Sequence, residues 1–444
     1  MSNLHLMIMK DTRRDFIKKS SLAAAGLTAA GLSGIPDALF AKERIPPSDR
    51  INIGLIGCRG RGFSVLREHL DIAGVNCLGM CDVDKNVLEK RSAEVKSTYD
   101  QKPKLYKDYR KMLEDKDLDA VLIGTPDHWH CLQTVHACQA GKDVYVEKPL
   151  ANSIEECNIM VRAANQYNRV VQVGQQQRSG RIWLDVMDHI KSGKIGKLVQ
   201  INTIQGHYGT GAGPEKQPDK PVPEGVDYDL WLGPAPKRSF NPARFHGSWR
   251  YFWDYGGGRM TDWGVHLLDM ALWAMDTNYP PAEAMAHGGN WTLMEGHCRE
   301  VFNTLSVIYK MKDHVITWNE NIDAPNGPYQ TNHRVEFVGE KGMIIADRHK
   351  WYLYAGGEPV KNVPEWDYPH AENFLDCIRT RNKPNCPIES ARNAAVCAHM
   401  GNIAIRSGAG RLIWDDEKNR FSNDEKANDY IVPEYRKPWD LPKV

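Results

Sequence analysis

A mostly apolar strand that runs into a glycine-rich turn and then a helix is the strongest structural signal in this sequence. Ile51–Ile56 reads as a buried strand, the turn Gly57–Gly62 (Gly-Cys-Arg-Gly-Arg-Gly) follows, and Phe63–Leu70 has helical character. Glycines let such a turn bend sharply and approach a pyrophosphate, which the helix N-terminus then holds. Arg59 replaces the middle glycine of the G-x-G-x-x-G pattern, and Gly60 supplies a neighbouring flexible point. The segment predicts a dinucleotide-binding βα unit.

The second strand ends in an acid. Val75–Cys81 is apolar and precedes Asp82, which lies 20 residues after Gly62. A carboxylate at this strand end is placed to bind the ribose hydroxyls and to repel a 2′-phosphate. We therefore expect NAD rather than NADP. Arg59 and Arg61 could instead stack on the adenine or bind a phosphate.

Strands and helices then alternate. The predicted elements are a strand at Leu118–Gly124, a helix at Trp129–Ala140, and strands at Asp143–Glu147 and Val170–Val173. This rhythm is typical of a parallel, doubly wound sheet whose ligands bind at the carboxyl ends of the strands. The connections Gly124–His130 and Glu147–Pro149 are therefore expected at the cofactor.

After Lys197 the pattern changes to strands separated by turns, with helices returning later. The predicted strands are Leu198–Thr203, Val301–Tyr309, Val315–Asn319, Arg334–Val338 and Met343–Asp347, and the predicted helices are Ala371–Arg381 and Ala391–Arg406. The Gly-, Pro- and Lys-rich segment Gly209–Pro223 is the best candidate for a loop that covers a site.

Three short motifs lie at the predicted strand ends and helix boundaries: Thr125-Pro126 followed by His130, Ala140-Gly141-Lys142, and Val146-Glu147-Lys148-Pro149. Together they resemble the glucose–fructose oxidoreductase / inositol dehydrogenase (Gfo/Idh/MocA) family, from about Ile51 to beyond Asp415. The resemblance implies an α/β protein in which a Rossmann doubly wound parallel sheet, residues 50–175, precedes an α/β domain, residues 176–415. That domain would have a large, mostly antiparallel open sheet for substrate binding and homo-oligomer contacts. Residues 416–444 would form a C-terminal tail.

The sequence also contains an Asp-x-x-x-His element after three glycines, with Asp262 and His266 four residues apart. On one helix both side chains would share a face. The resemblance implies that Lys148, Asp262 and His266 form the catalytic set. His266 suits a base that titrates near neutrality, and Lys148 suits a hydrogen bond to the same oxygen or the role of base itself. Asp262 would orient His266 or bind a substrate hydroxyl. Alone, this element is more often a solvated helix face.

The motifs, together with the resemblance, give a set of expected ligand contacts. Residues expected at the cofactor are Gly57, Cys58, Arg59, Gly60, Arg61, Gly62, Asp82, Thr125, Pro126, His128, His130, Glu147 and Lys148. Residues expected on the substrate side are Arg178, His207 and Tyr208. His128 and His130 form a pair that a metal could use, but the resemblance places this loop beside the nicotinamide ribose, so we expect no metal.

The N-terminal residues 1–41 have the features of a targeting signal. Arg13-Arg14 is followed by Phe16 and Lys18 and then by the small, mildly apolar run Ser20–Leu32. This resembles a twin-arginine export signal and predicts a periplasmic protein that crosses the membrane already folded. The alternative is an amphipathic helix with a chance arginine pair. The run is too short and too weakly apolar for a stable span, so no membrane span is expected once the signal is removed.

The charge balance argues against a nucleic-acid-binding protein, and the cysteine positions argue against a cysteine metal site. Lys and Arg number 57 and Asp and Glu 56, a net charge of +1, so there is no basic surplus for binding nucleic acid. The 10 cysteines show no metal-ligand spacing and fall largely in apolar runs, which indicates buried free thiols.

These features favour an oxidoreductase that transfers hydride between a tightly held nicotinamide and a secondary alcohol of a sugar, glycoside or polyol. An exported enzyme has little free NAD around it, which is why tight retention is expected. A redox-neutral, NAD-dependent glycosidase, acting by oxidation, elimination, hydration and reduction, is the second interpretation. A sugar- or nucleotide-binding sensor without catalysis is the third.

Overall fold

The computed structural model describes residues 50–206, 213–291, 295–321, 331–357, 359–364 and 369–444. The substrate-side candidates His207 and Tyr208 lie outside these residues. Within the described ranges, no helix combines the length and apolarity that crossing a membrane requires.

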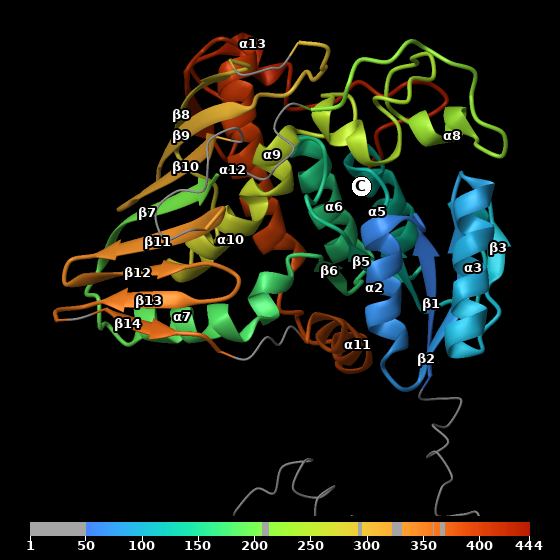
Figure 1. The fold of residues 1–444 in the computed structure, drawn as a ribbon, viewed down its shortest axis with the longest axis horizontal. Coiled ribbons are helices and arrows are strands. Elements are labelled where there is room, and N and C mark those ends of the chain that lie inside the picture. Colours follow the sequence, from blue (N-terminus) through green and yellow to red (C-terminus); the bar gives the residue numbers. More distant parts are fainter. Residues whose placement is uncertain (1–49, 207–212, 292–294, 322–330, 358, 365–368) are drawn as a thin grey trace, which may run out of the picture. The chain divides into compact units, whose positions relative to one another are not determined.

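The first sheet has six strands in the order β3-β2-β1-β4-β5-β6, all parallel (Figure 1). Its strands are β1 Ile51–Ile56, β2 Val75–Cys81, β3 Lys104–Tyr106, β4 Ala120–Ile123, β5 Asp143–Val146 and β6 Val171–Val173. Every residue of β4 and β5 is buried, because helices cover both faces of the sheet. The predicted Rossmann doubly wound sheet is confirmed.

The helices of this half connect the parallel strands. They are α2 Gly60–Leu70, α3 Lys85–Tyr99, α4 Tyr109–Leu113, the short 3₁₀ helix η3 Asp127–Trp129, α5 His130–Gln139 and α6 Ile154–Gln166. The side chains of Asp84 and Ser153 cap α3 and α6 by accepting backbone N–H groups of their first turns. α2 begins inside the glycine turn, at Gly60 rather than at Phe63.

The second sheet has ten strands in the order β14-β13-β12-β11-β7-β10-β9-β8-β15-β16. Its strands are β7 Leu198–Gln205, β8 Glu283–Gly289, β9 Thr304–Lys310, β10 Val315–Asn321, β11 His333–Gly339, β12 Gly342–Ala346, β13 Trp351–Tyr354, β14 Val360–Asn362, β15 Arg411–Asp415 and β16 Arg420–Phe421. Only β7 and β10 pair in parallel among the described neighbours. The expected large, mostly antiparallel open sheet is confirmed.

Helices cover one face of this sheet. The remaining helices are η4 Gln176–Ser179, α7 Arg181–Lys191, α8 Tyr228–Leu232, η5 His246–Tyr251, α9 Gly258–Asp262, α10 Gly264–Ala274, α11 His370–Thr380, α12 Ile388–Arg406 and α13 Glu425–Asn428. α12 contacts both β8 and α6, so it lies between the two sheets together with α10 (Figure 1). β9 alternates inward Leu305, Val307 and Tyr309 with outward Ser306 and Ile308, which leaves the other face open.

Two boundaries differ from the sequence prediction in ways that matter for the site. β9 begins at Thr304 rather than Val301, because the N–H groups of Glu300 and Val301 donate to the carbonyl of Tyr251 in η5. The helix expected to carry Asp262 and His266 is interrupted at Trp263, which separates α9 from α10. The two side chains therefore do not share one continuous helical face.

Candidate active site

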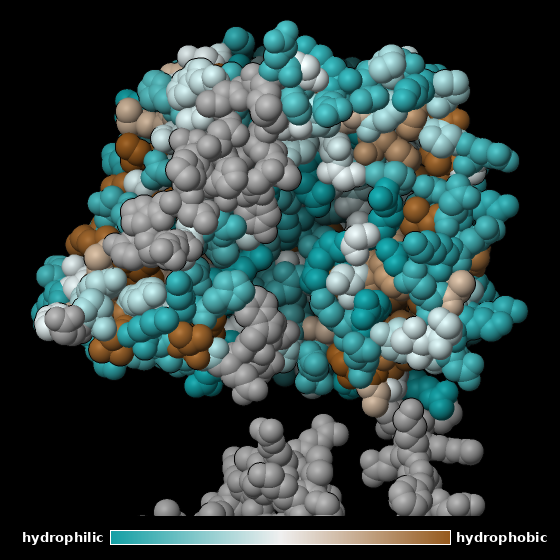
Figure 2. All heavy atoms as spheres, in the orientation of Figure 1, coloured by the Kyte–Doolittle hydropathy of each residue, from teal (hydrophilic) through white to brown (hydrophobic). Residues whose placement is uncertain are grey.

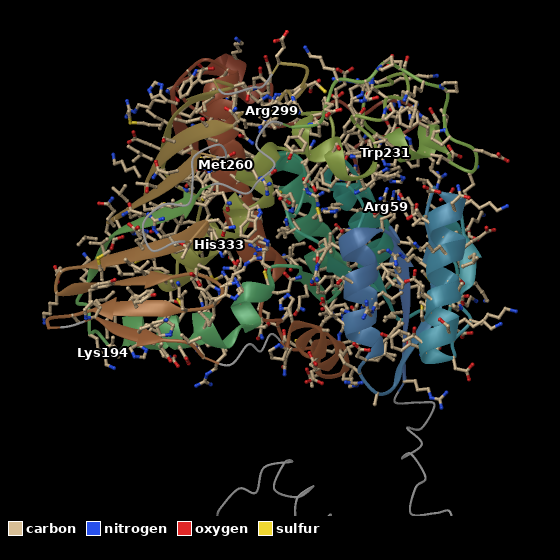
Figure 3. All side chains as sticks on the ribbon, viewed as in Figure 1. Arg59, Lys194, Trp231, Met260, Arg299 and His333 are labelled. Atoms are coloured by element: carbon tan, nitrogen blue, oxygen red, sulfur yellow. The ribbon has the colours of Figure 1, made fainter. Side chains whose placement is uncertain are left out.

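A cavity of about 950 Å³ lies at the carboxyl ends of β1, β2, β4 and β5. Second-domain residues close its other side, and they include Trp231, His246, Trp249, Arg250, Trp263, His266 and Arg348. In the space-filling view the surface is hollowed between the two halves, and mostly hydrophilic residues surround the hollow (Figure 2). Figure 3 shows Arg59 at the start of α2 and Trp231 on α8; both residues line the cavity. The volume is in the upper range of cofactor and ligand sites.

The glycine turn is shaped for close backbone approach. A Cβ on Gly62 would come within 2.1 Å of the carbonyl oxygen of Gly57, so no side chain fits where α2 packs against the strand end. A Cβ on Gly60 would meet nothing within 4 Å, and this residue lines the cavity with a φ of +37°. The backbone at the start of α2 is thus open to a ligand, as binding of a dinucleotide pyrophosphate requires.

Asp82 lines the cavity at the end of β2. Its Oδ2 accepts the backbone N–H of Cys58 at 2.7 Å, and its Oδ1 accepts that of Asp84 at 2.9 Å. These bonds fix the carboxyl group beside the turn, and burial raises its pKa above the ordinary value. Cys58 is not among the residues that line the cavity, and its Sγ donates to the carbonyl oxygen of Cys81 at 3.4 Å. An acid in this place fits the ribose of NAD.

The loop after β4 divides into lining and supporting residues. Thr125 and Pro126 line the cavity, as expected. His128 and His130 do not; both are buried, with His128 Nε2 3.1 Å from the carbonyl oxygen of Trp231. The His130 ring lies between the carbonyl oxygens of Pro149 (2.8 Å from Nδ1) and Thr125 (2.9 Å from Nε2). We expected direct cofactor contact, but these histidines instead join the loops that line the cavity.

Lys148 is held by Asp262. Its Nζ donates to Oδ1 of Asp262 at 2.6 Å and to the main-chain oxygen of the same residue at 2.8 Å. The Nε of Arg250 donates to the same Oδ1 at 3.0 Å, and Arg259 Nη1 lies 3.8 Å from Oδ2. Burial alone would raise the pKa of Asp262, but Lys148, Arg250 and Arg259 outweigh it and hold the pKa well below its usual range. Asp262 is therefore a permanent carboxylate that anchors Lys148.

His266 lines the same cavity as Lys148. Its Nδ1 is buried and has no hydrogen-bond partner among the residues that the structure describes. Burial, with the positive charges of Arg348 and Lys148, lowers the pKa of His266 well below its ordinary value. The imidazole is therefore neutral at neutral pH, and its lowered pKa contradicts the expectation of a base that titrates near neutrality. Among the described residues, the Asp262 carboxylate accepts its hydrogen bonds from Lys148 and Arg250, not from His266.

The other predicted residues also divide into those that line the cavity and those that do not. Glu147 and Arg61 line the cavity and form an ion pair with 3.0 Å between Oε1 and Nε. Arg178 does not line it; the guanidinium forms a two-pronged pair with Asp269, with contacts of 2.7 to 3.0 Å. Gly57 lines the cavity, whereas Gly62 lies behind it. Within the described ranges, no cluster of three or more His, Cys, Asp or Glu side chains could hold a metal ion.

Sequence reasoning missed several residues that line the cavity. Trp249, Arg250 and Arg348 come from segments without periodicity or motif, so nothing local identified them. Asp127 is different, because it stands inside the loop motif Thr125–His130 and faces the cavity while 3% exposed. Its position two residues after Thr125 was a usable signal.

Residues 51–175 match the model "Oxidoreductase family, NAD-binding Rossmann fold", and residues 186–441 match "Oxidoreductase family, C-terminal alpha/beta domain". A glycosyl hydrolase family 109 protein of Shewanella baltica (strain OS155) is 29% identical over 214 residues, and one of Shewanella sp. (strain MR-4) is 28% identical over 214 residues. The match covers 45% of this chain and 45% of each relative, so the chain spans less than half the length of these relatives.

Solved structures share the fold. Aldose-aldose oxidoreductase from Caulobacter crescentus, complexed with glycerol, has a TM-score of 0.63 at 16% identity and covers 82% of this chain and 100% of its own. Levoglucosan dehydrogenase, complexed with NADH and levoglucosan, has a TM-score of 0.62 at 17% identity and covers 82% of this chain and 99% of its own. At these identities the likeness establishes the fold alone. Together with the two family models, which match most of the chain, it shows that this protein belongs to the Gfo/Idh/MocA oxidoreductase family and has its NAD-binding Rossmann domain.

Proposed function

We propose that the protein is an NAD-dependent oxidoreductase that transfers hydride between a tightly held nicotinamide and a secondary alcohol of a sugar, glycoside or polyol. One observation carries this proposal: Lys148, anchored by Asp262, and the neutral His266 line the same cavity as the glycine turn and Asp82. A proton acceptor and a cation therefore face the dinucleotide site together. Members of the same fold that are named as sugar enzymes, such as levoglucosan dehydrogenase, support the substrate class.

The geometry favours different chemical roles for Lys148 and His266. Bound NAD supplies the hydride acceptor. A neutral imidazole can take the hydroxyl proton as the carbon–hydrogen bond breaks, and His266 is neutral at neutral pH. Lys148 has two donor directions committed to Asp262, which leaves its remaining N–H for the substrate oxygen. We therefore assign proton acceptance to His266 and stabilisation of alkoxide charge to Lys148, with Asp262 as the positioning residue for Lys148.

The compartment and assembly belong to the same proposal. Arg13-Arg14 and the small-residue run after it support export by the twin-arginine route to the periplasm, with the nucleotide bound before export. Homo-oligomerisation through the open sheet is supported by apolar side chains on its strands that are about half exposed: Val199 at 45%, Met285 at 47% and Ile308 at 50%.

A redox-neutral glycosidase is the second candidate, and the relatives named as glycosyl hydrolase family 109 proteins favour it. Such an enzyme also needs a proton acceptor and an oxygen-binding cation beside the nicotinamide, so Lys148 and His266 serve either reaction. The difference lies in the product: a glycosidase returns the nucleotide to its starting state and releases a leaving group.

The test is direct. The purified protein is denatured to release and identify its nucleotide, and the intact protein is mixed with sugars, polyols and glycosides. A change in nicotinamide absorbance with an oxidised sugar product supports the oxidoreductase. A released aglycone or sugar without net redox change gives the glycosidase first place. Bound nucleotide with neither change, for any compound, contradicts both and leaves the sensor interpretation.

A further inference from the structure

Arg250 presents a pre-organised guanidinium to the cavity. Its Nε is fixed on Asp262 at 3.0 Å, and its guanidinium carbon lies 4.2 Å from the centre of the Trp249 ring. The two terminal nitrogens have no hydrogen-bond partner among the described residues, although Arg250 lines the cavity with 37% of its side chain exposed. A planar fork that is clamped at one edge and open at the other matches the geometry of a carboxylate or a phosphate oxygen pair.

A second arginine faces the same space. Arg348 lines the cavity, and its guanidinium carbon lies 4.5 Å from the centre of the Trp263 ring. Its Nε and Nη2 donate to Oε1 of Gln177 at 3.1 and 3.0 Å, which fixes its orientation. Arg348 also contributes to the low pKa of His266, so its charge reaches the group that would accept the proton.

The charges at this end of the cavity do not balance. Lys148 and Arg250 are cations that share the carboxylate of Asp262, and Arg348 also lines the cavity. Asp127 also lines the cavity, but burial raises its pKa well above the ordinary value and favours its neutral form. Glu147 is paired with Arg61. A neutral sugar would leave the positive surplus uncompensated in a partly enclosed site, whereas an anion would complete it.

We propose that the natural substrate is an anionic sugar, carrying a carboxylate or a sulfate or phosphate ester, and that the Arg250 fork binds this group while Arg348 adds to the attraction. The inference rests on the proposed function, because it places the sugar beside Lys148 and His266. Arg250 touches the carboxylate that anchors Lys148, so the anionic group would lie next to the reacting alcohol.

The experiment compares matched pairs. Binding of D-glucuronate, glucose 6-sulfate and glucose 6-phosphate is measured by calorimetry against D-glucose, and D-galacturonate against D-galactose, on the purified protein saturated with NAD. At least one anionic sugar is expected to bind roughly 10- to 100-fold more tightly than its neutral partner, as hydrogen bonds to charged groups allow. Which anionic sugar it is separates carboxylate from sulfate and phosphate. Equal or weaker binding in every pair overturns the inference.

Three variants assign the preference to its residues. Arg250→Gln is expected to reduce the anionic preference to near unity, and Arg250→Lys, which keeps the charge and loses the fork, to retain only part of it. Arg348→Gln is expected to lower it by a few-fold and serves as the second variant if Arg250→Gln does not fold. An unchanged preference in all three variants overturns the assignment. So does an equal loss of NAD affinity in Arg250→Gln, which would place Arg250 in the nucleotide site.

Turnover of the same sugars separates this inference from the proposed function. A strong anionic preference in binding without any change of nicotinamide absorbance keeps the inference and contradicts the oxidoreductase. Turnover of neutral sugars as efficient as that of their anionic partners supports the oxidoreductase and contradicts the anionic preference.

Discussion

Removing the charge of Asp262 tests the ion pair at the centre of the site. In Asp262→Asn, Lys148 and Arg250 lose a carboxylate that each contacts within 3.0 Å, with the Lys148 and Asp262 side chains only 13% and 14% exposed. Breaking a buried ion pair costs about 3 to 5 kcal/mol. Because Lys148 and Arg250 open onto the cavity and can regain some hydration, we expect a loss of about 2 to 3 kcal/mol in the free energy of unfolding.

The same substitution should damage turnover more than nucleotide binding. Lys148 would lose the contacts that aim it, so kcat should fall by roughly 10²- to 10³-fold, the usual cost of losing one group that stabilises developing oxyanion charge. Asp262 itself does not line the cavity, so NAD affinity should stay within a few-fold of the parent. Urea denaturation, steady-state kinetics and nucleotide titration measure the three quantities.

Asp269→Asn is the matched control. Asp269 is also buried and ion-paired, with Arg178, but neither residue lines the cavity. Because the Arg178–Asp269 pair does not open onto the cavity, Asp269→Asn should lose at least as much stability while keeping kcat. Parental kcat in Asp262→Asn, or an equal loss of kcat in both variants, would refute the reasoning.

Three further predictions concern the fold and the cofactor. Gly62→Ala should abolish folding or nucleotide binding, because its Cβ would lie 2.1 Å from the Gly57 carbonyl oxygen, whereas Gly247→Ala, with nothing within 4 Å, should fold normally; circular dichroism and nucleotide content distinguish them. Asp82→Asn should weaken NAD binding by roughly 10-fold and narrow the preference over NADP, as titration with both nucleotides would show, and an unchanged ratio would argue against this role. Burial lowers the pKa of His399 from 6.5 to about 4, so the stability that its neutral form contributes is complete above pH 6.5 and is lost as the pH falls toward 4, by about 2 kcal/mol at pH 5. Urea unfolding at pH 7 and pH 5 should therefore show a smaller drop in the free energy of unfolding for His399→Gln than for the parent protein. An equal drop in both proteins would contradict this prediction.

The parts of the site that could be predicted from the sequence are those fixed by local chain geometry. The run Ile51–Leu70 identified the first strand, the turn and the helix, because apolar periodicity and glycine placement act within a few residues. The strand ends then located Asp82, Thr125 and Lys148 at the cavity, since parallel strands finish at one edge of a sheet.

The rest depends on packing between distant segments. Trp249 and Arg250 reach the cavity through a 3₁₀ helix whose backbone receives the N–H groups of Glu300 and Val301, a contact that no local pattern encodes. The helix is interrupted at Trp263 and Asp262 pairs with Lys148, although the spacing of Asp262 and His266 had predicted a shared helical face. Helical spacing shows what one uninterrupted helix would align, and an interruption of a single residue removes that inference.

The central claim is that Lys148 and His266 act on one substrate oxygen. A double-mutant cycle in kcat with Lys148→Met, His266→Asn and the double variant, each checked for nucleotide content, tests it most directly. We predict that each single substitution lowers kcat by roughly 10²-fold or more while the nucleotide is retained. We also predict that the kcat of the double variant is only slightly lower than that of the less active single variant. Near-parental turnover in either single variant, or losses that simply multiply in the double variant, would contradict the claim.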